Sequence, residues 1–345
     1  MKTNTNLTIE DVAREAKVSI STVSRAINSE TRKKVASATL RKIDRIVKKY
    51  GYAPNFAART LRAASTKTIG VIFPAFAGIF SNTYYINIFS GISDFFLDTE
   101  YKFKIIPLKG GQVNPVNYDF RAAEGVDGLI AAHWPHFFSH QDVLALDIPC
   151  VFLNDYEENL PVYCCGGDQF TGGKVAARYL LEQGHKKIGL ITGEEKSSDS
   201  RLRVLGFTNY LKAHGIVLPE SAVVCGNYHE DEAYKLADSF IAKNPGLTAI
   251  FCCNDEMAIG FIRRLEERGI NCPGQISIMG YDNIARAGSF SPGITTIEEP
   301  LYQIAREGAR ILVDYLKAGD FSRPLAGERF FPPALIKRES VKTFS

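Results

Sequence analysis

Short apolar runs separated by amphipathic stretches recur along the chain from Thr68 onward. The runs predict buried strands at Ile69–Phe73, Phe103–Ile106, Leu129–Ala132, Cys150–Leu153, Ile188–Ile191, Val223–Cys225, Ala249–Cys253 and Ile276–Met279. The stretches between most of them predict helices at about 82–98, 171–183, 200–214, 230–243 and 255–268. This alternation indicates an α/β fold with parallel sheets. Because the strands are too many for one compact sheet and the pattern breaks near 154–167, we expect two similar lobes with a cleft between them.

The first sixty-odd residues show a helical period instead. Thr8 is suited to cap a first helix, in which apolar residues from Ile9 to Ala16 recur at helical spacing. After a short connection, Ser19 is suited to cap a second helix, Ile20–Ile27. Two short helices joined by a tight turn predict a helix-turn-helix, which a third helix at about 37–50 follows.

The second helix of such a motif lies in the DNA major groove with its N-terminal residues against base edges. Its exposed positions are expected to be Ile20, Ser21, Thr22 and Arg25. Arg25 can bond O6 and N7 of guanine, and Ile20 can contact a thymine methyl group. Further along, Asn55 can cap a helix of about two turns, which is too short to be stable without a partner surface.

Charge divides the chain at the same boundary. Up to Thr68 it has fifteen lysines and arginines against five carboxylates, a net charge of +10. The remainder has 26 basic against 33 acidic residues, a net charge of −7, so the whole-chain value of +3 conceals the contrast. A compact basic module is attracted to the phosphate backbone. We therefore expect the head to bind double-stranded DNA and the acidic body to have another role.

Composition narrows the class of protein. The 345 residues allow two or three domains. No apolar run reaches the roughly 20 residues that a membrane helix needs, and the polar N-terminus shows no signal peptide, so a cytoplasmic protein without membrane contact is expected. The seven cysteines show no C-x-x-C spacing and read as reduced, buried thiols. The chain contains no G-x-S-x-G, P-loop or H-E-x-x-H motif, so we predict no catalytic residue, cofactor or metal.

Two segments of the head resemble the lactose-repressor/galactose-repressor (LacI/GalR) family of bacterial transcription regulators. They are TIEDVAREAKVSISTVSR at 8–25 and YGYAPN at 50–55. The resemblance implies that Ile20 and Ser21 set operator preference and that Arg25 contacts a base. It also implies a hinge helix in the minor groove, where Leu61 is wedged between central base pairs. The remaining DNA-binding residues that we expect are Thr8, Ser19, Thr22, Tyr52, Asn55, Ala58 and Arg59.

Two positions depart from the family's usual pattern. Ala36 stands where a serine usually caps the third helix, and Ser37 is the available substitute. Ile20 stands where many members have a tyrosine or another side chain with hydrogen-bond donors. The operator half-site is therefore expected to differ from the best-known ones.

The resemblance extends through the body, at 168–173, 184–188, 253–260, 276–283 and 292–297. It implies a core similar to periplasmic sugar-binding proteins, with two lobes joined by three crossovers. We expect a helix-turn-helix domain at 1–54, a hinge helix and linker at 55–67, and an effector-binding and dimerisation core at 68–345. Within the core, lobe one would take about 68–166 and 297–324, and lobe two about 167–296 and 325–345.

Ligands of open α/β folds bind beyond the carboxyl ends of strands. Matched to the family, the effector contacts are Arg203, Asn254 and Asp282, with an aromatic wall from Tyr84 or Tyr85 and Tyr228. Trp134 either closes over the ligand or packs within its lobe. An aspartate and an arginine can bond a ring of hydroxyls while an aromatic face covers a pyranose, but the same set could hold a nucleobase.

Two further aspartates read mainly as helix caps. Asp255 is expected to cap the helix at 256–268 rather than to contact the ligand. Asp168 can cap the helix that follows it or lie near the effector.

These features together predict a DNA-binding repressor that binds a near-palindromic operator as a homodimer and responds to a small-molecule effector, with a sugar favoured. The alternatives are a purine-like or phosphorylated corepressor, or a sugar-binding or sugar-converting protein with a fused head. Turnover of a bound sugar would distinguish the enzyme. The tail after Pro333 has no leucine heptads, which favours a dimer over a tetramer.

Overall fold

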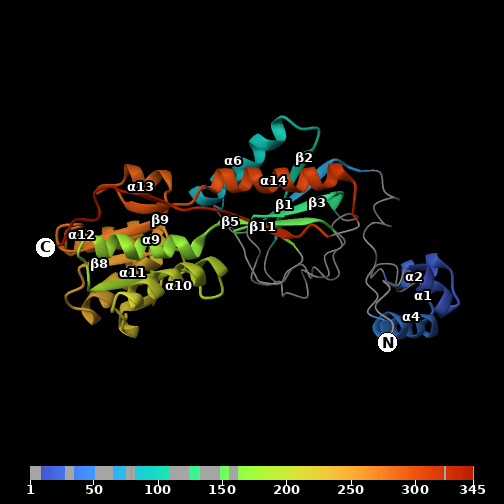
Figure 1. Cartoon of the computed structure of the whole chain (residues 1–345), viewed down its shortest axis with the longest axis horizontal. Coiled ribbons are helices and arrows are strands. Elements are labelled where there is room, and N and C mark those ends of the chain that lie inside the picture. The colour runs from blue at the N-terminus through green and yellow to red at the C-terminus, as the bar shows by residue number, and fades with distance from the viewer. Residues whose placement is uncertain are drawn as a thin grey trace.

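The computed structural model describes residues 9–27, 35–50, 65–74, 79, 82–108, 124–132, 148–154, 162–321 and 324–344. Two six-stranded sheets form the body, and a group of short helices forms the head (Figure 1). The predicted α/β fold with two sheets and a helix-turn-helix head is confirmed.

The head contains α1 (Ile9–Ala16), α2 (Ile20–Ile27) and α4 (Ser37–Tyr50), as the helical period predicts. Its small core is made of apolar side chains from all three helices, namely Val12, Ala13, Ala16, Val23, Ala26, Ile43 and Ile46. Lys17 takes a left-handed backbone conformation with φ of 54° between α1 and α2. The N–H of Val18 then donates to the carbonyl of Ala13 at 3.0 Å, which closes the tight turn.

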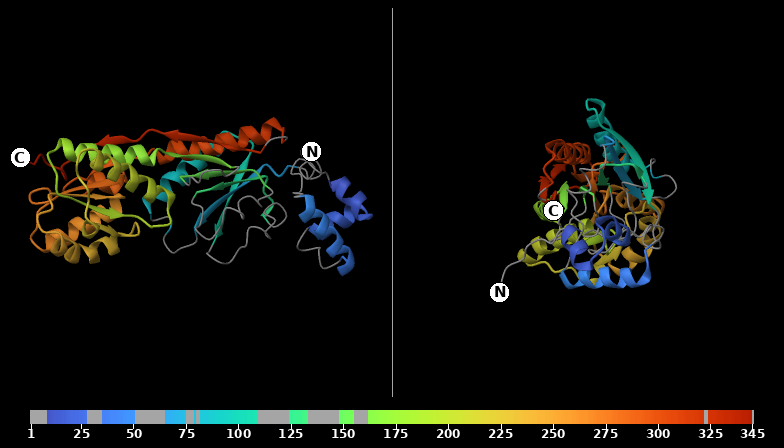
Figure 2. Two further views of the ribbon diagram at one scale, coloured as in Figure 1. Left: turned by 60° about the horizontal axis from the view of Figure 1, so that its bottom comes forward. Right: turned by 90° about the vertical axis from the view of Figure 1, so that its right-hand side faces the viewer.

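The sheet of lobe one has the strand order β11-β5-β4-β3-β1-β2, with all neighbours parallel. Its strands are β1 (Thr68–Pro74), β2 (Lys102–Leu108), β3 (Gly128–Ala131), β4 (Cys150–Leu153), β5 (Tyr163–Gly167) and β11 (Gly327–Phe331). Helices α6 (Thr83–Leu97) and α14 (Leu301–Ala318) pack side by side along it (Figure 2). The two helices can approach closely because residue 91 is a glycine. A Cβ at this position would lie 2.2 Å from the carbonyl oxygen of Tyr302.

The sheet of lobe two has the order β12-β10-β9-β8-β6-β7, parallel except for β12. Its strands are β6 (Ile188–Thr192), β7 (Val223–Cys225), β8 (Ala249–Cys252), β9 (Ser277–Asp282), β10 (Thr295–Glu298) and β12 (Ala334–Ile336). The helical elements are α9 (Gln169–Glu182), α10 (Ser198–Ala213), a 3-10 turn at Glu220–Ala222, α11 (Glu230–Lys243), α12 (Asp255–Glu267) and α13 (Ala285–Ser289).

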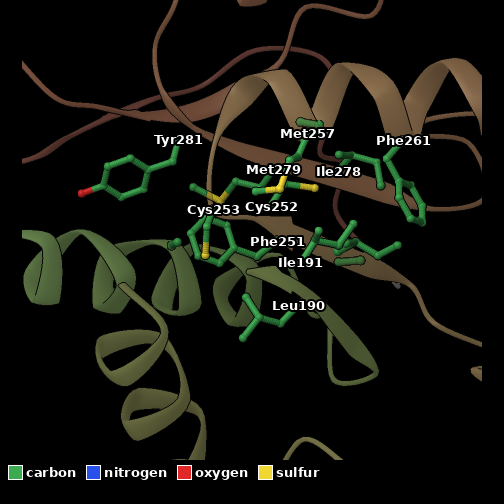
Figure 3. Packing of buried hydrophobic residues seen from close by; sticks show 14 of the residues in the cluster. Leu190, Ile191, Phe251, Cys252, Cys253, Met257, Phe261, Ile278, Met279 and Tyr281 are labelled. Carbon is green, nitrogen blue, oxygen red and sulfur yellow. The ribbon is translucent and has the colours of Figure 1, made fainter. Parts of the chain in front are cut away.

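The core of lobe two fills the space between its sheet and its helices (Figure 3). Phe251 on β8 stacks on Phe207 of α10 with ring centroids 4.7 Å apart. Cys252 and Cys253 are buried in the same core, and all seven cysteines are free thiols. The prediction that they are buried is confirmed for five of them but is wrong for Cys225, which is exposed, and for Cys272, which is only partly buried.

The chain passes between the sheets three times: between β5 and α9, between β10 and α14, and between β11 and β12. Two predicted boundaries need correction. Residues 297 and 298 still belong to β10 in lobe two, so the second crossover begins at Glu299. The third crossover follows Phe331 rather than residue 324, because β11 pairs with β5 in lobe one.

Four strands and two helices were absent from the sequence prediction: β5, β10, β11, β12, α13 and α14. The hinge helix expected at about 55–62 lies outside the described residues. Among the residues that the structure describes, no helix is both long enough and apolar enough to span a bilayer.

Candidate functional site

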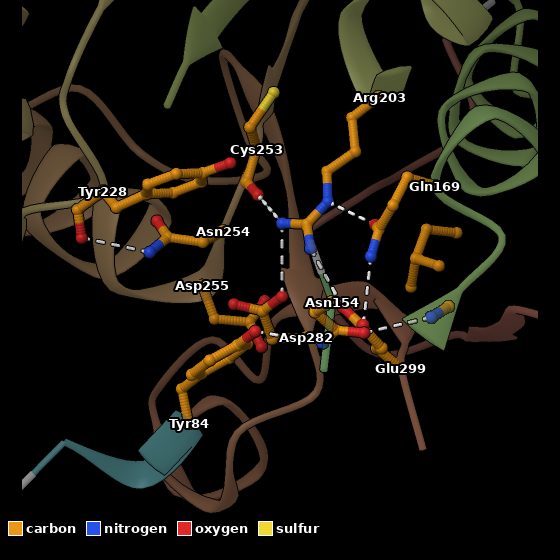
Figure 4. A network of polar contacts seen from close by, with 12 residues as sticks. Tyr84, Asn154, Gln169, Arg203, Tyr228, Cys253, Asn254, Asp255, Asp282 and Glu299 are labelled. Carbon is orange, nitrogen blue, oxygen red and sulfur yellow. Dashed lines mark hydrogen bonds and ion pairs between the residues drawn. The ribbon is translucent and has the colours of Figure 1, made fainter. Parts of the chain in front are cut away.

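The carboxyl ends of β8, β9 and β10 lie next to one another because these strands are parallel neighbours. Polar side chains follow each of them: Asn254 after β8, Asp282 at the end of β9 and Glu299 after β10. The structure connects Asp282 and Glu299 to Arg203, which α10 positions at the centre of a buried polar cluster (Figure 4).

Arg203 is buried and makes three hydrogen bonds. Its Nε donates to Oε1 of Gln169 at 2.7 Å, its Nη1 to the carbonyl of Cys253 at 2.7 Å and its Nη2 to Oε2 of Glu299 at 2.9 Å. Oδ1 of Asp282 lies 3.3 Å from Nη1. One guanidinium therefore joins the ends of β8 and β9 to the second crossover.

The two carboxylates of this cluster are both buried. Burial raises the pKa of Glu299 and that of Asp282, while the positive charge of Arg203 opposes both shifts. Oδ1 of Asp282 accepts no hydrogen bond although it is buried. An acceptor in this state is suited to a ligand that donates a hydrogen bond.

A strained turn presents Asp282. Asp282 and Asn283 both have positive φ, at 98° and 53°. Asn283 is held from two sides: its Nδ2 donates to Glu298 at 2.9 Å, and Nη2 of Arg338 donates to its Oδ1 at 2.6 Å. Such over-determined turns are typical of functional sites.

Aromatic rings surround the guanidinium. Cζ of Arg203 lies 3.8 Å from the centroid of the Tyr281 ring and 6.0 Å from that of Tyr228. The Tyr228 ring covers Gly193, where an added Cβ would come within 2.1 Å of it. Tyr84 reaches the cluster from lobe one, where its hydroxyl accepts a hydrogen bond from Nδ2 of Asn154 at 2.9 Å.

Burial and the nearby carboxylates both change the pKa values of the tyrosines of lobe one. Burial raises the pKa of Tyr84, and Glu299 and Asp199 raise it further. Burial likewise raises the pKa of Tyr85, which packs edge-on against Phe73 and Tyr84. Both tyrosines are therefore neutral hydroxyl groups at physiological pH.

The expected cap of α12 needs correction. Asn254, not Asp255, is the N-cap: its Oδ1 accepts the N–H of Met257 at 2.9 Å, and its Nδ2 donates to the carbonyl of Tyr228 at 3.0 Å. Asp255 is fully buried and accepts the N–H of Ile284 instead. Asp168 is a cap, since its Oδ1 accepts the N–H of Thr171 at the start of α9.

The structure thus brings together five residues of the predicted effector set: Tyr84, Arg203, Tyr228, Asn254 and Asp282. Tyr85 packs edge-on against Tyr84, and Trp134 lies outside the described residues. Sequence reasoning missed Asn154, Gln169, Tyr281 and Glu299. Two carboxylates, Glu298 and Glu299, follow the Thr-Thr-Ile run of β10, and only the fold shows that Glu299 is the one that pairs with Arg203.

Two family models match the chain. Residues 8–55 match the bacterial regulatory proteins of the lacI family, and residues 177–341 match a periplasmic binding protein-like domain. The HTH-type transcriptional repressor PurR of Photobacterium profundum is 33% identical over 340 residues, which cover 97% of this chain and 98% of that protein. The chain belongs to the lacI family of bacterial regulatory proteins. The PurR repressor of Vibrio atlanticus is 32% identical over 343 residues, 98% of this chain and 99% of that protein.

Solved structures of transcriptional regulators share this fold. The CelR–cellobiose complex superposes with a TM-score of 0.74 at 24% identity and covers 97% of this chain and all of that one. The lac repressor dimer bound to operator and the anti-inducer ONPF gives a TM-score of 0.71 at 24% identity, over 98% of this chain and all of that one. A lacI-family regulator of Enterococcus faecium with bound ribose gives a TM-score of 0.69 at 25% identity, and the match covers 81% of this chain and all of that one.

In this lacI-family regulator, α2 begins at a serine cap. Oγ of Ser19 accepts the N–H of Thr22 at 3.2 Å and lies 2.8 Å from Oγ of Ser21. Ser21 and Arg25 are exposed one turn apart, and Nε of Arg25 donates to the carbonyl of Ser21. Ile20 is half-buried against the core of the head, so only part of its side chain is open to a base.

Several expected DNA contacts fall outside the described residues, namely Thr8, Tyr52, Asn55, Ala58, Arg59 and Leu61.

Proposed function

We propose that this regulator represses transcription in the cytoplasm as a homodimer on a near-palindromic operator. We also propose that a small-molecule effector, bound around Arg203 and Asp282, sets its affinity for DNA. One observation carries the proposal: a single chain joins a basic helix-turn-helix head to a two-lobed core whose strand ends gather Arg203 and two buried carboxylates. Binding at one site then biases the other through the arrangement of the lobes.

The head supports readout in the major groove. Val23 and Ala26 anchor α2 to the core of the head, which leaves Ser21 and Arg25 on its exposed side. Arg25 is our choice for the base-specific contact and the positive charges of α4 for phosphate contacts. Two heads on two half-sites, with the segment at 55–62 as a minor-groove hinge and Leu61 as its wedge, complete the proposed complex.

A sugar is the effector that we favour. The site combines buried carboxylates, of which Asp282 has an unused acceptor oxygen, with the rings of Tyr84, Tyr228 and Tyr281, a combination suited to a polyol with one apolar face. The Enterococcus faecium regulator, with bound ribose, supports this choice. A nucleobase is the second candidate, because a flat ring would fit beside the same tyrosines.

The DNA-binding half of the proposal is tested with an operator selected by the wild-type protein from random-sequence DNA. We expect Arg25→Ala to weaken binding to the selected operator by roughly 10- to 100-fold while binding to random DNA falls far less. Arg41→Ala removes an equal charge from the exposed side of α4 and should weaken binding to the operator and to random DNA by the same factor. Equal selectivity of the two variants in fluorescence anisotropy titrations would refute the role of α2.

The effector half is tested by the same titrations in the presence of ligand. A small molecule that binds the core should change the operator Kd severalfold and be recovered chemically unchanged. If bound ligand leaves the operator Kd unaltered, or if it is converted to a product, the core is not the sensor that we propose.

A further inference from the structure

The guanidinium of Arg203 has little left to offer a ligand. Three of its five N–H groups already donate to Gln169, Cys253 and Glu299, and Asp282 lies 3.3 Å from Nη1. Its single positive charge is thus shared between two buried carboxylates. Whether one or both of these are ionised, the cluster has no net positive charge.

Further hydrogen-bond acceptors lie around this cluster among the described residues. Oδ1 of Asp282 is buried and accepts no hydrogen bond. Asp199 and Glu194 lie close enough to raise the pKa of Tyr85 after the larger effect of burial. A ligand that enters here meets carboxylates and tyrosine hydroxyls, and it gains most by donating hydrogen bonds.

Glu299 cannot move aside to release Arg203. Its side chain is 1% exposed, and its Oε1 accepts a second hydrogen bond from Nε2 of Gln169 at 3.0 Å. The backbone of Gly167 packs against it so closely that a Cβ on that glycine would lie 2.9 Å from Oε1. The first and second crossovers therefore enclose this carboxylate.

From this geometry we propose that the site selects an effector that carries no negative charge and is rich in hydroxyl or amine donors, and that Glu299 enforces the selection. The inference deepens the proposed function and rests on it. Phosphorylated sugars and nucleotides are excluded because Arg203, the buried guanidinium among the described residues of the site, is neutralised from within. Uncharged polyols and amino sugars are admitted because they can donate to Asp282.

The wild-type chain tests the selection without any substitution. Isothermal titration calorimetry compares D-ribose with ribose 5-phosphate, D-glucose with glucose 6-phosphate, and inosine with inosine monophosphate, with D-glucosamine as the amine-bearing member. We expect at least one uncharged or amine-bearing compound to bind, and each phosphate ester to bind about 10-fold or more weakly than its parent. A phosphate ester that binds as tightly as its parent, or a panel in which no uncharged or amine-bearing member binds, overturns the proposal.

The role of Glu299 is tested with Glu299→Gln, which keeps the shape and removes the charge. The ratio between the Kd of the ester and that of the parent should shrink by roughly 10-fold. Glu328→Gln removes a carboxylate from an exposed position on β11 and should leave the ratio unchanged. If Glu299→Gln keeps the wild-type ratio, or Glu328→Gln lowers it equally, Glu299 does not set the selection.

Direct binding separates this proposal from the proposed function. A protein that discriminates against esters but whose operator affinity ignores every bound ligand would sustain the charge selection and refute effector control. A protein whose operator affinity responds best to a phosphate ester would sustain effector control and refute the charge selection.

Discussion

Asp255 accepts a hydrogen bond from the backbone N–H of Ile284 at 2.9 Å and so secures the turn that presents Asp282. Asp255 is fully buried at the start of α12, and its other carboxylate oxygen accepts no hydrogen bond. Burial raises its pKa to about 7, although the hydrogen bond from the N–H of Ile284 opposes the shift. A group in this state makes stability depend on pH.

The direction of this dependence follows from the proton balance. Between about pH 4 and pH 7 the unfolded chain has lost the Asp255 proton while the folded chain retains it. The free energy of unfolding contributed by this group therefore falls as pH rises through that window and levels off above it. The free energy of unfolding of Asp255→Asn, relative to that of wild type, should therefore rise by up to about 4 kcal/mol between pH 4 and pH 8. Urea denaturation at a series of pH values measures the difference.

Asp98→Asn is the control for this comparison. Asp98 is exposed at the end of α6, so its substitution should displace the pH curve by a nearly constant amount. Parallel curves for wild type and Asp255→Asn would show that Asp255 does not retain its proton.

Removing the Arg203 side chain tests the central ion pairs. Arg203→Ala leaves Glu299 and Asp282 buried without their cation, which should lower the free energy of unfolding by about 3–5 kcal/mol at pH 8. The loss should shrink in acid, because protonation of the two carboxylates removes the unpaired charge. Chemical denaturation at pH 8 and pH 5 measures both effects.

Arg201→Ala provides a matched comparison on the same helix. Arg201 is exposed and donates only to the carbonyl of Lys196 among the contacts described, so its loss should change stability by no more than about 0.5 kcal/mol. If the two variants were equally stable, the buried cluster would not be held together by Arg203.

The regular elements were predictable where burial is complete. β4 was predicted at Cys150–Leu153 and α11 at 230–243, and the structure has the same bounds. Every residue of β4 is buried, as in parallel strands covered on both faces, so a plain apolar run identifies it. The head was predictable because its two short helices and tight turn are local in sequence.

Elements defined by distant partners were not predictable in this way. β11 is a largely exposed segment whose strand character comes from pairing with β5, about 160 residues earlier. The third crossover was misplaced for that reason. α14 is different: Leu301, Ile304, Ala305 and Gly308 recur at helical spacing on its buried side, so its sequence does contain the signal.

The residues of the candidate site likewise include some that were predicted from sequence and some that depend on distant parts of the fold. Arg203, Asn254 and Asp282 came from the family resemblance, and they do lie together. Glu299 escaped prediction because only the fold brings the second crossover to α10. The cap of α12 was misassigned by one residue, because Asn254 has extended backbone angles and the helix begins after it.

The linker between head and core ends on a single carboxylate, and this attachment predicts how the two are coupled. Asp127, which precedes β3 and is buried, accepts hydrogen bonds from the hydroxyl of Ser65, from the N–H and hydroxyl of Thr66, and from the N–H of Lys67, at 2.6–3.0 Å. Lobe one therefore fixes the last residues of the linker. Among the described residues, this attachment is a route by which a change in the lobe can reach the linker.

Asp127→Asn replaces one of the two acceptor oxygens by an NH₂ group, which cannot accept from Ser65 or Lys67. We expect a loss of about 1–3 kcal/mol in the stability of the core, since hydrogen bonds to a charged group are removed. On the proposed function, ligand affinity measured by calorimetry should stay within about twofold of wild type, while the ligand-induced change in operator Kd should fall severalfold. Asp98→Asn again serves as control and should preserve both quantities. An unaltered ligand response of the Asp127→Asn operator complex would show that coupling between core and head does not depend on this attachment.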